Sequence, residues 1–212
     1  MNYVLSALMG YLAGTVNPAY ILAKIHGFDI REKGSRNAGA SNALILFGKV
    51  RGVLCAVFDI AKATCIIWLT AKIFSPANTF AVTSTACILG HIFPFYMNFK
   101  GGKGLACIAG SILAYDLRVF GIFLAAEVVI ALATNYICFV PISASAAFPV
   151  VYGIMSRDLW GVLLFCLVAV VVVCKHIVNI KRILKGHEAR LSYLWSRDKE
   201  TARLRRNYGE EE

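Results

Sequence analysis

The chain has 212 residues, of which 58% are hydrophobic, and it carries a formal net charge of +10. A soluble domain of this composition would have too few polar residues to cover its surface, so lipid must form part of its surroundings. A helix that crosses a bilayer needs about 20 mainly apolar residues. The chain therefore has room for about seven spans joined by short loops, and the remaining length excludes a separate soluble domain.

The apolar segments predict an all-α transmembrane bundle. Residues 3–24 open without the basic stretch that a cleaved signal peptide needs, so we expect them to form the first span. Six more spans are expected at 52–74, 77–98, 104–116, 119–139, 141–156 and 159–179. The segment 104–116 is short, because about 13 residues cover only about 20 Å as a helix. It is either a short tilted span or a re-entrant segment, and we expect a span.

Lysine and arginine set the expected orientation. With seven spans, 18 of the 22 basic residues fall on one side, in 24–51, 98–104, 139–142 and 174–212. The opposite side receives Lys72, Arg118 and Arg157. The sequence therefore predicts a multi-pass cell-membrane protein with its N-terminus outside and its C-terminus in the cytoplasm.

Two parts of unequal size are expected. Residues 1–188 form the membrane domain, and residues 189–212 form a tail of mixed charge that ends in Glu210–Glu212. We expect this tail to be a cytoplasmic helix that lies near anionic lipid and frays toward its end.

The spacing of cysteine and histidine gives no metal-binding motif. The seven cysteines all lie in apolar stretches without a C-x-x-C pair, and the four histidines include no H-x-x-x-H pair. We therefore expect the cysteines to be small buried side chains, and we expect no metal and no cofactor. Because the basic residues follow the membrane topology, no nucleic-acid partner is indicated.

Two polar clusters on the basic side have the composition of anion-binding loops. The first, KGSRNAGASN, runs from Lys33 to Asn42, and the second, GHIFPFYMNFKGGKG, runs from Gly90 to Gly104. Glycine, serine and asparagine allow backbone N–H groups to turn toward an anion. The second cluster is not a Walker A loop, so nucleotide hydrolysis is not indicated. Either cluster alone is compatible with a tight turn and interfacial anchors, but two on one face favour phosphate binding.

The third cluster, KHIVNIKRILKGHE, runs from Lys175 to Glu188 at the inner end of the last span. His176 and Asn179 are three residues apart and share a helical face, which Arg182 continues. A basic helix end alone is an ordinary membrane anchor. The imidazole and the amide, however, find no partner in lipid, so we expect them to belong to a site.

Three ionisable residues lie deeper in the predicted spans. Asp59 and Lys62 are spaced i, i+3, so they either form a structural ion pair or position a substrate. Glu127 has no partner near it in the sequence and is expected to be a protonated or hydrogen-bonded carboxyl group. A path lined by the three would suit a small organic-anion transporter, although no repeat with broken helices is visible.

Together these motifs resemble those of the bacterial integral-membrane acyl-phosphate:glycerol-3-phosphate acyltransferases of the PlsY type. Gly34–Asn42, Gly90–Gly104 and Lys175–Glu188 match the three cytoplasmic motifs of that family in order, and the resemblance covers about residues 5–190. It implies transfer of a fatty acyl group from acyl phosphate to the 1-hydroxyl of glycerol 3-phosphate, giving lysophosphatidic acid for phospholipid synthesis. The implied partners are these two small molecules and membrane lipid.

One departure from the family pattern concerns phosphate binding. The family has an arginine three residues after its first motif, where this chain has Ile45. Either Arg36, at a position that is usually glycine, or Arg51 supplies the missing charge. Otherwise the chain has diverged to another acceptor or has lost activity.

The implied reaction needs no covalent nucleophile, because an acyl phosphate already carries a good leaving group, and the chain has no G-x-S-x-G motif. It needs neutralised phosphates, a positioned hydroxyl and help with one proton, which either His176 or the acyl phosphate accepts. The expected catalytic residues are His176, Asn179, Lys103 and Ser35. The expected substrate-binding residues are Gly34, Arg36, Asn37, Gly39, Ser41, Asn42, Lys100, Gly101, Gly102 and Ser143.

Overall fold

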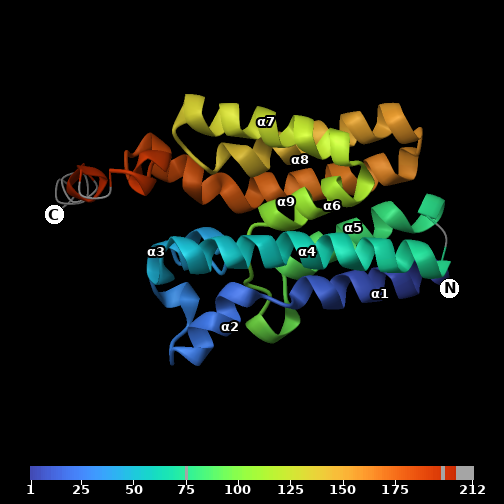
Figure 1. The fold of residues 1–212 in the computed structure, drawn as a ribbon, viewed down its shortest axis with the longest axis horizontal. Coiled ribbons are helices and arrows are strands. Elements are labelled where there is room, and N and C mark those ends of the chain that lie inside the picture. The colour runs from blue at the N-terminus through green and yellow to red at the C-terminus, as the bar shows by residue number, and fades with distance from the viewer. Residues whose placement is uncertain (75, 197–198, 204–212) are drawn as a thin grey trace.

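The computed structural model describes residues 1–74, 76–196 and 199–203, and this part of the chain contains no strand. The long helices run side by side along one axis of the molecule (Figure 1). In chain order the elements are α1 (Asn2–Thr15), α2 (Pro18–Ile25), η1 (Ile30–Glu32), α3 (Ala40–Phe47), α4 (Lys49–Phe74), α5 (Pro76–Ile92), η2 (Phe95–Met97), α6 (Leu105–Tyr115), α7 (Leu117–Thr134), α8 (Phe139–Ser156), α9 (Leu159–Leu184) and η3 (Leu191–Leu194).

The all-α prediction is confirmed for the described residues. Every predicted span contains a helix, and most of the helix ends fall within a few residues of the predicted bounds. Among the described residues, 6 helical stretches are long and apolar enough to cross a membrane, and α6 is a shorter apolar helix. The number of crossings and the orientation of the termini remain predictions.

The first predicted span is interrupted rather than continuous. It consists of α1 and α2, which are separated at Val16 and Asn17. Pro18 has no backbone N–H and favours an extended conformation in the residue before it. Asn17 caps α2, since its side chain accepts a hydrogen bond of 2.8 Å from the backbone N–H of Tyr20. Hydropathy alone does not reveal this break, because both sides of it are apolar.

Small residues allow the N-terminal helices to pack closely. Gly10 and Gly14 of α1 face the backbone of α5, and Gly110 of α6 faces the backbone of α4 at Ile60. A Cβ atom at any of these glycines would overlap the neighbouring helix. Close approach through small residues is a common way to join transmembrane helices, and here it joins α1 to α5 and α6 to α4.

The C-terminal helices form the other layer of the bundle, with α7, α8 and α9 along one side of Figure 1. Aromatic rings of Phe148 and Tyr152 of α8 pack on Phe165 of α9, with ring centroids 4.8 and 5.0 Å apart. Helix α5 also contacts α9, which joins the two layers.

The expectation that all cysteines are buried is wrong for three of them. Cys65, Cys166 and Cys174 are exposed on the protein surface, while the other four are buried. The three lie on long apolar helices, where an outward-facing thiol meets the surroundings of the bundle. Helical periodicity allowed either face, and the sequence pattern did not decide between them.

The described part of the tail packs against the bundle. Asn135, in the turn between α7 and α8, accepts hydrogen bonds from the backbone N–H groups of Leu191 and Ser192, at 2.7 and 3.0 Å. Arg203 donates to the backbone carbonyls of Gly186 and Glu188, each at 2.7 Å. Glu210–Glu212 lie outside the described residues, and the boundary at residue 188 remains a prediction.

Candidate functional site

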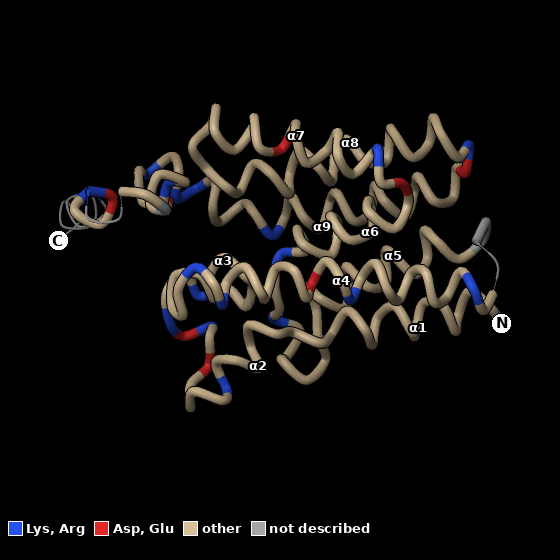
Figure 2. The backbone as a smooth tube through the Cα atoms, in the orientation of Figure 1, with Lys and Arg blue, Asp and Glu red and all other residues tan. Residues whose placement is uncertain are grey.

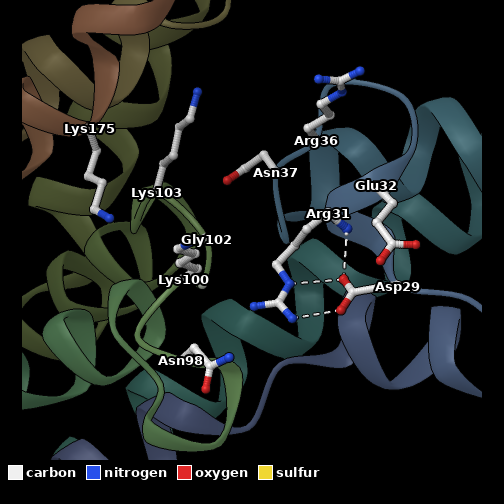
Figure 3. Close-up of a pocket in the computed structure, with 11 residues that line it drawn as sticks. Asp29, Arg31, Glu32, Arg36, Asn37, Asn98, Lys100, Gly102, Lys103 and Lys175 are labelled. Carbon is white, nitrogen blue, oxygen red and sulfur yellow. Dashed lines mark hydrogen bonds and ion pairs between the residues drawn. The ribbon is translucent and has the colours of Figure 1, made fainter.

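A pocket of about 440 Å³ lies where three distant stretches of the chain meet. In Figure 3, Arg31, Arg36 and Asn37 lie on one side of it, and Lys103 and Lys175 lie on the other. Its lining residues are Asp29, Arg31, Glu32, Arg36, Asn37, Asn98, Lys100, Gly101, Gly102, Lys103 and Lys175. Each stretch includes residues of one of the three polar clusters of the sequence, and the first also includes Asp29, Arg31 and Glu32, which precede its cluster.

One wall of the pocket is the segment between α2 and α3, residues 26–39, which we call the first loop. It is shaped by the buried side chain of Asn42. Its Oδ1 accepts the backbone N–H of Ser35 at 2.8 Å, and its Nδ2 donates to the carbonyls of Ile30 and Lys33. Gly34 has φ +61° and lies directly against this amide, which leaves no room for a Cβ. The polar atoms of Asn42 are therefore used within the loop itself.

The second loop, residues 93–104, is folded back onto the end of α5. Gly101 and Gly102 donate their backbone N–H groups to the carbonyls of Ile92 and His91, both at 3.0 Å. A Cβ on Gly101 would meet the His91 carbonyl, and one on Gly102 would meet the imidazole ring of His91. The glycines are thus needed for close packing, and they place Lys100 and Lys103 at the pocket.

Arg31 connects the two loops. Its guanidinium pairs with Asp29 at 2.6 Å and donates to the carbonyl of Met97 in the second loop, also at 2.6 Å. The hydrogen bonds from Arg31 outweigh partial burial and lower the pKa of the Asp29 carboxyl group, which stays ionised. The first and second loops therefore form one structure around the pocket.

The third cluster supplies a hydrogen-bonded chain behind Lys103. The Lys103 ammonium donates to Asn179 Oδ1, and Asn179 Nδ2 donates to Glu188 Oε1 at 2.5 Å. Burial lowers the pKa of Lys103, and the carboxylate of Glu188 partly offsets this effect. In the described part of the chain no hydrogen bond joins His176 to Asn179; the imidazole Nδ1 instead lies 2.8 Å from the Val172 carbonyl.

The expected site residues divide into those at the pocket and those away from it. Arg36, Asn37, Lys100, Gly101, Gly102 and Lys103 line the pocket. The remainder, Gly34, Ser35, Gly39, Ser41, Asn42, Ser143, His176 and Asn179, are not among its lining residues. Ser143 donates to Glu127 Oε2 at 2.6 Å, so it provides the hydrogen-bond partner expected for that carboxyl group.

Five lining residues were not expected at the site: Asp29, Arg31, Glu32, Asn98 and Lys175. Asn98 and Lys175 belong to the polar clusters and could have been included on that ground. Asp29 and Arg31 precede the first cluster, and their acid–x–base spacing was the available signal.

The electrostatics of the pocket favour an anion. Five of the lining residues are cationic and two are acidic, and one acid, Asp29, is neutralised by Arg31. Among the described residues, the side chains of Arg36 and Lys100 make no ion pair or hydrogen bond with protein groups. Such cations are available to a phosphate or a carboxylate.

One group of potential metal ligands occurs in the described residues. The ligand atoms of Asp59, His91 and Cys107 lie within 4.8 Å of one another. However, the Lys62 ammonium lies 2.6 Å from Asp59 Oδ1, so a positive charge is already in place. Because this charge would repel a second cation, we assign the cluster to Lys62 and not to a metal.

Comparisons with known proteins identify relatives of this chain over most of its length. The family model described as glycerol-3-phosphate acyltransferase matches residues 4–186. Glycerol-3-phosphate acyltransferase 1 of Oceanobacillus iheyensis is 33% identical over 209 residues, which cover 93% of this chain and 99% of that protein. The glycerol-3-phosphate acyltransferase of Pseudothermotoga lettingae is 35% identical over 188 residues, covering 89% of this chain and 94% of that protein.

The fold is also similar to a solved structure. The crystal structure of PlsY (YgiH), an integral membrane glycerol 3-phosphate acyltransferase in its glycerol 3-phosphate form, matches with a TM-score of 0.83 at 27% identity. The match covers 92% of this chain and 98% of that chain.

Proposed function

The chain belongs to the glycerol-3-phosphate acyltransferase family, and on that premise we propose that its pocket binds glycerol 3-phosphate and that an acyl phosphate is the acyl donor. The protein is an integral-membrane acyltransferase whose acceptor is glycerol 3-phosphate. In the reaction, the 1-hydroxyl oxygen forms a bond to the acyl carbon, and the bond from that carbon to the phosphate oxygen breaks. The hydroxyl proton leaves, and inorganic phosphate is released.

The cationic pocket is the single observation that carries the proposal. The side chains of Lys100 and Arg36 make no ion pair or hydrogen bond with other described residues, and both residues line the same cavity. Lys103 is held by Asn179 and reaches the pocket from the opposite side. Two phosphates enter the reaction, one on each substrate, and cations on opposite walls can neutralise both. Placing the substrates between fixed groups also supplies much of the rate enhancement.

We assign the proton to His176. Its Nδ1 lies 2.8 Å from the Val172 carbonyl, so this nitrogen carries the hydrogen and Nε2 retains a lone pair. We propose that Nε2 accepts the proton of the acceptor hydroxyl; His176 is buried and is not among the lining residues of the pocket, so this role requires the hydroxyl to reach beyond that lining. The leaving phosphate is the alternative acceptor. A His176→Gln variant separates the two, because only the first assignment predicts a large fall in kcat.

We further propose that the site faces the cytoplasm. Lysine and arginine gather toward the end of the bundle where α2, α3 and the tail lie, and fewer occur at the opposite end (Figure 2). The positive-inside rule supports a cytoplasmic position for the basic end.

Arg36 is our candidate for the charge that the family arginine supplies and that Ile45 lacks. Both arginines are exposed, but Arg36 lines the pocket and Arg51 does not. Arg31 also lines the pocket, but its guanidinium is paired with Asp29.

A single assay tests the proposed function against its alternatives. Purified protein in lipid vesicles is given radiolabelled glycerol 3-phosphate together with palmitoyl phosphate or, in parallel, a palmitoyl thioester. A labelled lipid product formed from palmitoyl phosphate alone is the expected result. Product formed only from the thioester would refute the donor assignment. Uptake of label without product would indicate a transporter. Absence of both product and uptake would indicate a chain that has changed its acceptor or lost activity.

A further inference from the structure

A buried polar cluster beneath the pocket has no part in the chemistry just described. It consists of Asp59 and Lys62 on α4 and His91 on α5, and Asp59 and His91 are only 1% and 3% exposed. The Lys62 Nζ lies 2.6 Å from Asp59 Oδ1 and 3.2 Å from His91 Nδ1. Ionisable residues inside membrane spans are costly and are retained where they have a task.

The Lys62 ammonium reaches the break between α1 and α2. It donates to the carbonyls of Gly14 and Val16, at 3.0 and 2.5 Å. The Gly14 carbonyl has lost its helical donor, because the residue four positions later is Pro18, which has no N–H. Within a membrane span such a carbonyl must find another donor in the protein. Lys62 is that donor, so its role extends beyond neutralising Asp59.

The same break holds the first loop. Asn17 lies in the break, and its Nδ2 donates to the carbonyl of Ala38 at 2.7 Å. Ala38 follows Asn37, which lines the pocket. The position of the break therefore sets the position of this wall.

The break and the cluster also hold the second loop. The Tyr96 hydroxyl donates to the Thr15 carbonyl at 2.6 Å. His91 accepts the backbone N–H of Gly102 on its own carbonyl at 3.0 Å, and its ring lies directly against Gly102. Both pocket walls are thus tied to the point that Lys62 secures.

We propose that Lys62 is a positioning residue for acyl transfer. Its ammonium occupies the kind of place where carbonyls of broken transmembrane helices coordinate a metal cation in transporters. From there it fixes the α1–α2 break, and through the break and His91 it aligns the two loops that carry Arg36, Lys100 and Lys103. This inference rests on the proposed function, because it concerns the alignment of the same pocket.

Two single variants distinguish a positioning role from a simple ion pair. Asp59→Asn leaves the Lys62 ammonium bonded to the carbonyls of Gly14 and Val16, whereas Lys62→Met removes that ammonium. If the pair served only to neutralise charge, either change would break it equally. We expect Lys62→Met to lower kcat/KM for glycerol 3-phosphate at least about 10-fold more than Asp59→Asn, with a raised KM, since small misplacements of binding groups are costly to rate. Equal losses in the two variants would overturn the proposal.

The double variant Asp59→Asn/Lys62→Met separates stability from alignment. It removes both members of the Asp59–Lys62 ion pair, so its melting temperature in detergent is expected to recover toward that of the wild type. Its kcat/KM is expected to stay low, because the carbonyls of the break still lack their donor. Recovery of both quantities would show that the cluster is merely structural.

A third variant covers the case in which the charge changes prevent folding. Tyr96→Phe removes the donor to the Thr15 carbonyl without altering any charge. It is expected to raise the KM for glycerol 3-phosphate while the melting temperature falls only by the cost of one hydrogen bond. An unchanged KM would overturn the proposal. Tyr152→Phe is the matched control, since the Tyr152 hydroxyl bonds Asp158 at 2.8 Å, away from the pocket. Inactive wild-type protein would instead refute the proposed function itself, so the two failures are distinguishable.

Discussion

The two ends of the bundle use charged side chains in different ways. At the end away from the pocket, Asp116 accepts the backbone N–H groups of Arg118 and Val119 and caps α7. Asp158 likewise caps α9 through the N–H of Gly161, at 3.0 Å. These carboxylates are used within the protein, as helix caps usually are.

At the pocket end, several charges are left available. Arg36 and Lys100 face the cavity with no protein partner among the described residues. Lys103 is intermediate, because it is bonded to Asn179 and also lines the pocket. The side chains of Lys72, Arg118 and Arg157 at the other end also make no ion pair or hydrogen bond among the described residues. The ligand site is therefore marked by unpaired cations that line one cavity, and not by unpaired charge alone.

The largest expected effect is at Lys103. Lys103→Ala removes a cation from the site of acyl transfer, and we expect kcat/KM in isolated membranes to fall by about 100-fold or more. The assay is the formation of labelled lipid from glycerol 3-phosphate, normalised to the amount of protein.

Lys72→Ala, in the last turn of α4, is the matched control for loss of a lysine and is expected to have wild-type activity. His176→Ala should match Lys103→Ala if the imidazole is the base. Normal turnover in both Lys103→Ala and His176→Ala would end the assignment of the site.

A smaller effect is expected at Arg36, our candidate for the charge that the family arginine supplies. Arg36→Gly removes a cation that lines the pocket, whereas Arg51→Ala removes one that does not. We expect the first change to raise the KM for glycerol 3-phosphate about 10-fold, the size of one charge-assisted hydrogen bond. Steady-state kinetics at saturating acyl phosphate provide the measurement. Equal KM values for the two variants would mean that another group binds this phosphate.

The next effect is on pH dependence. The carboxylate of Glu188 raises the pKa of Lys103 against the lowering caused by burial. Glu188→Gln keeps an acceptor for Asn179 but removes the charge, so the pKa of Lys103 falls further and its ammonium form is lost at a lower pH. The alkaline limb of the kcat/KM profile is therefore expected to move to lower pH. A limb that stays in place, or moves to higher pH, would contradict the coupling between these residues.

The smallest effect on activity is expected at the opposite end. Asp116→Ala removes the cap of α7, and we expect it to lower stability by about 1 kcal/mol while the KM for glycerol 3-phosphate stays unchanged. Thermal unfolding in detergent and the standard assay together test this. A raised KM would show that the two ends are coupled and would weaken the comparison.

The sequence was sufficient for the helices and for the three polar clusters. Long apolar segments have few alternatives in lipid, because every backbone group must be bonded within the segment. Glycine and asparagine at high density indicated loops that bind an anion, and residues of all three clusters line one pocket.

The remaining features depend on tertiary contacts that no local pattern specifies. The break at Asn17 was hidden because the hydropathy on both sides is similar, although Pro18 was a visible signal. The partners of Asn179 are Lys103 and Glu188, and helical spacing had suggested His176 instead. The pairing of Ser143 with Glu127 joins two helices and cannot be read from either one alone.

The account depends most directly on three stretches forming one cytoplasmic pocket. In a variant whose seven native cysteines are replaced, single cysteines are introduced as Asn37→Cys, Lys100→Cys and Lys175→Cys, and a membrane-impermeant maleimide is applied to sealed vesicles of each orientation. All three positions should react from the cytoplasmic side only, and glycerol 3-phosphate should slow each reaction. Labelling of these positions from different sides of the membrane would contradict the shared pocket.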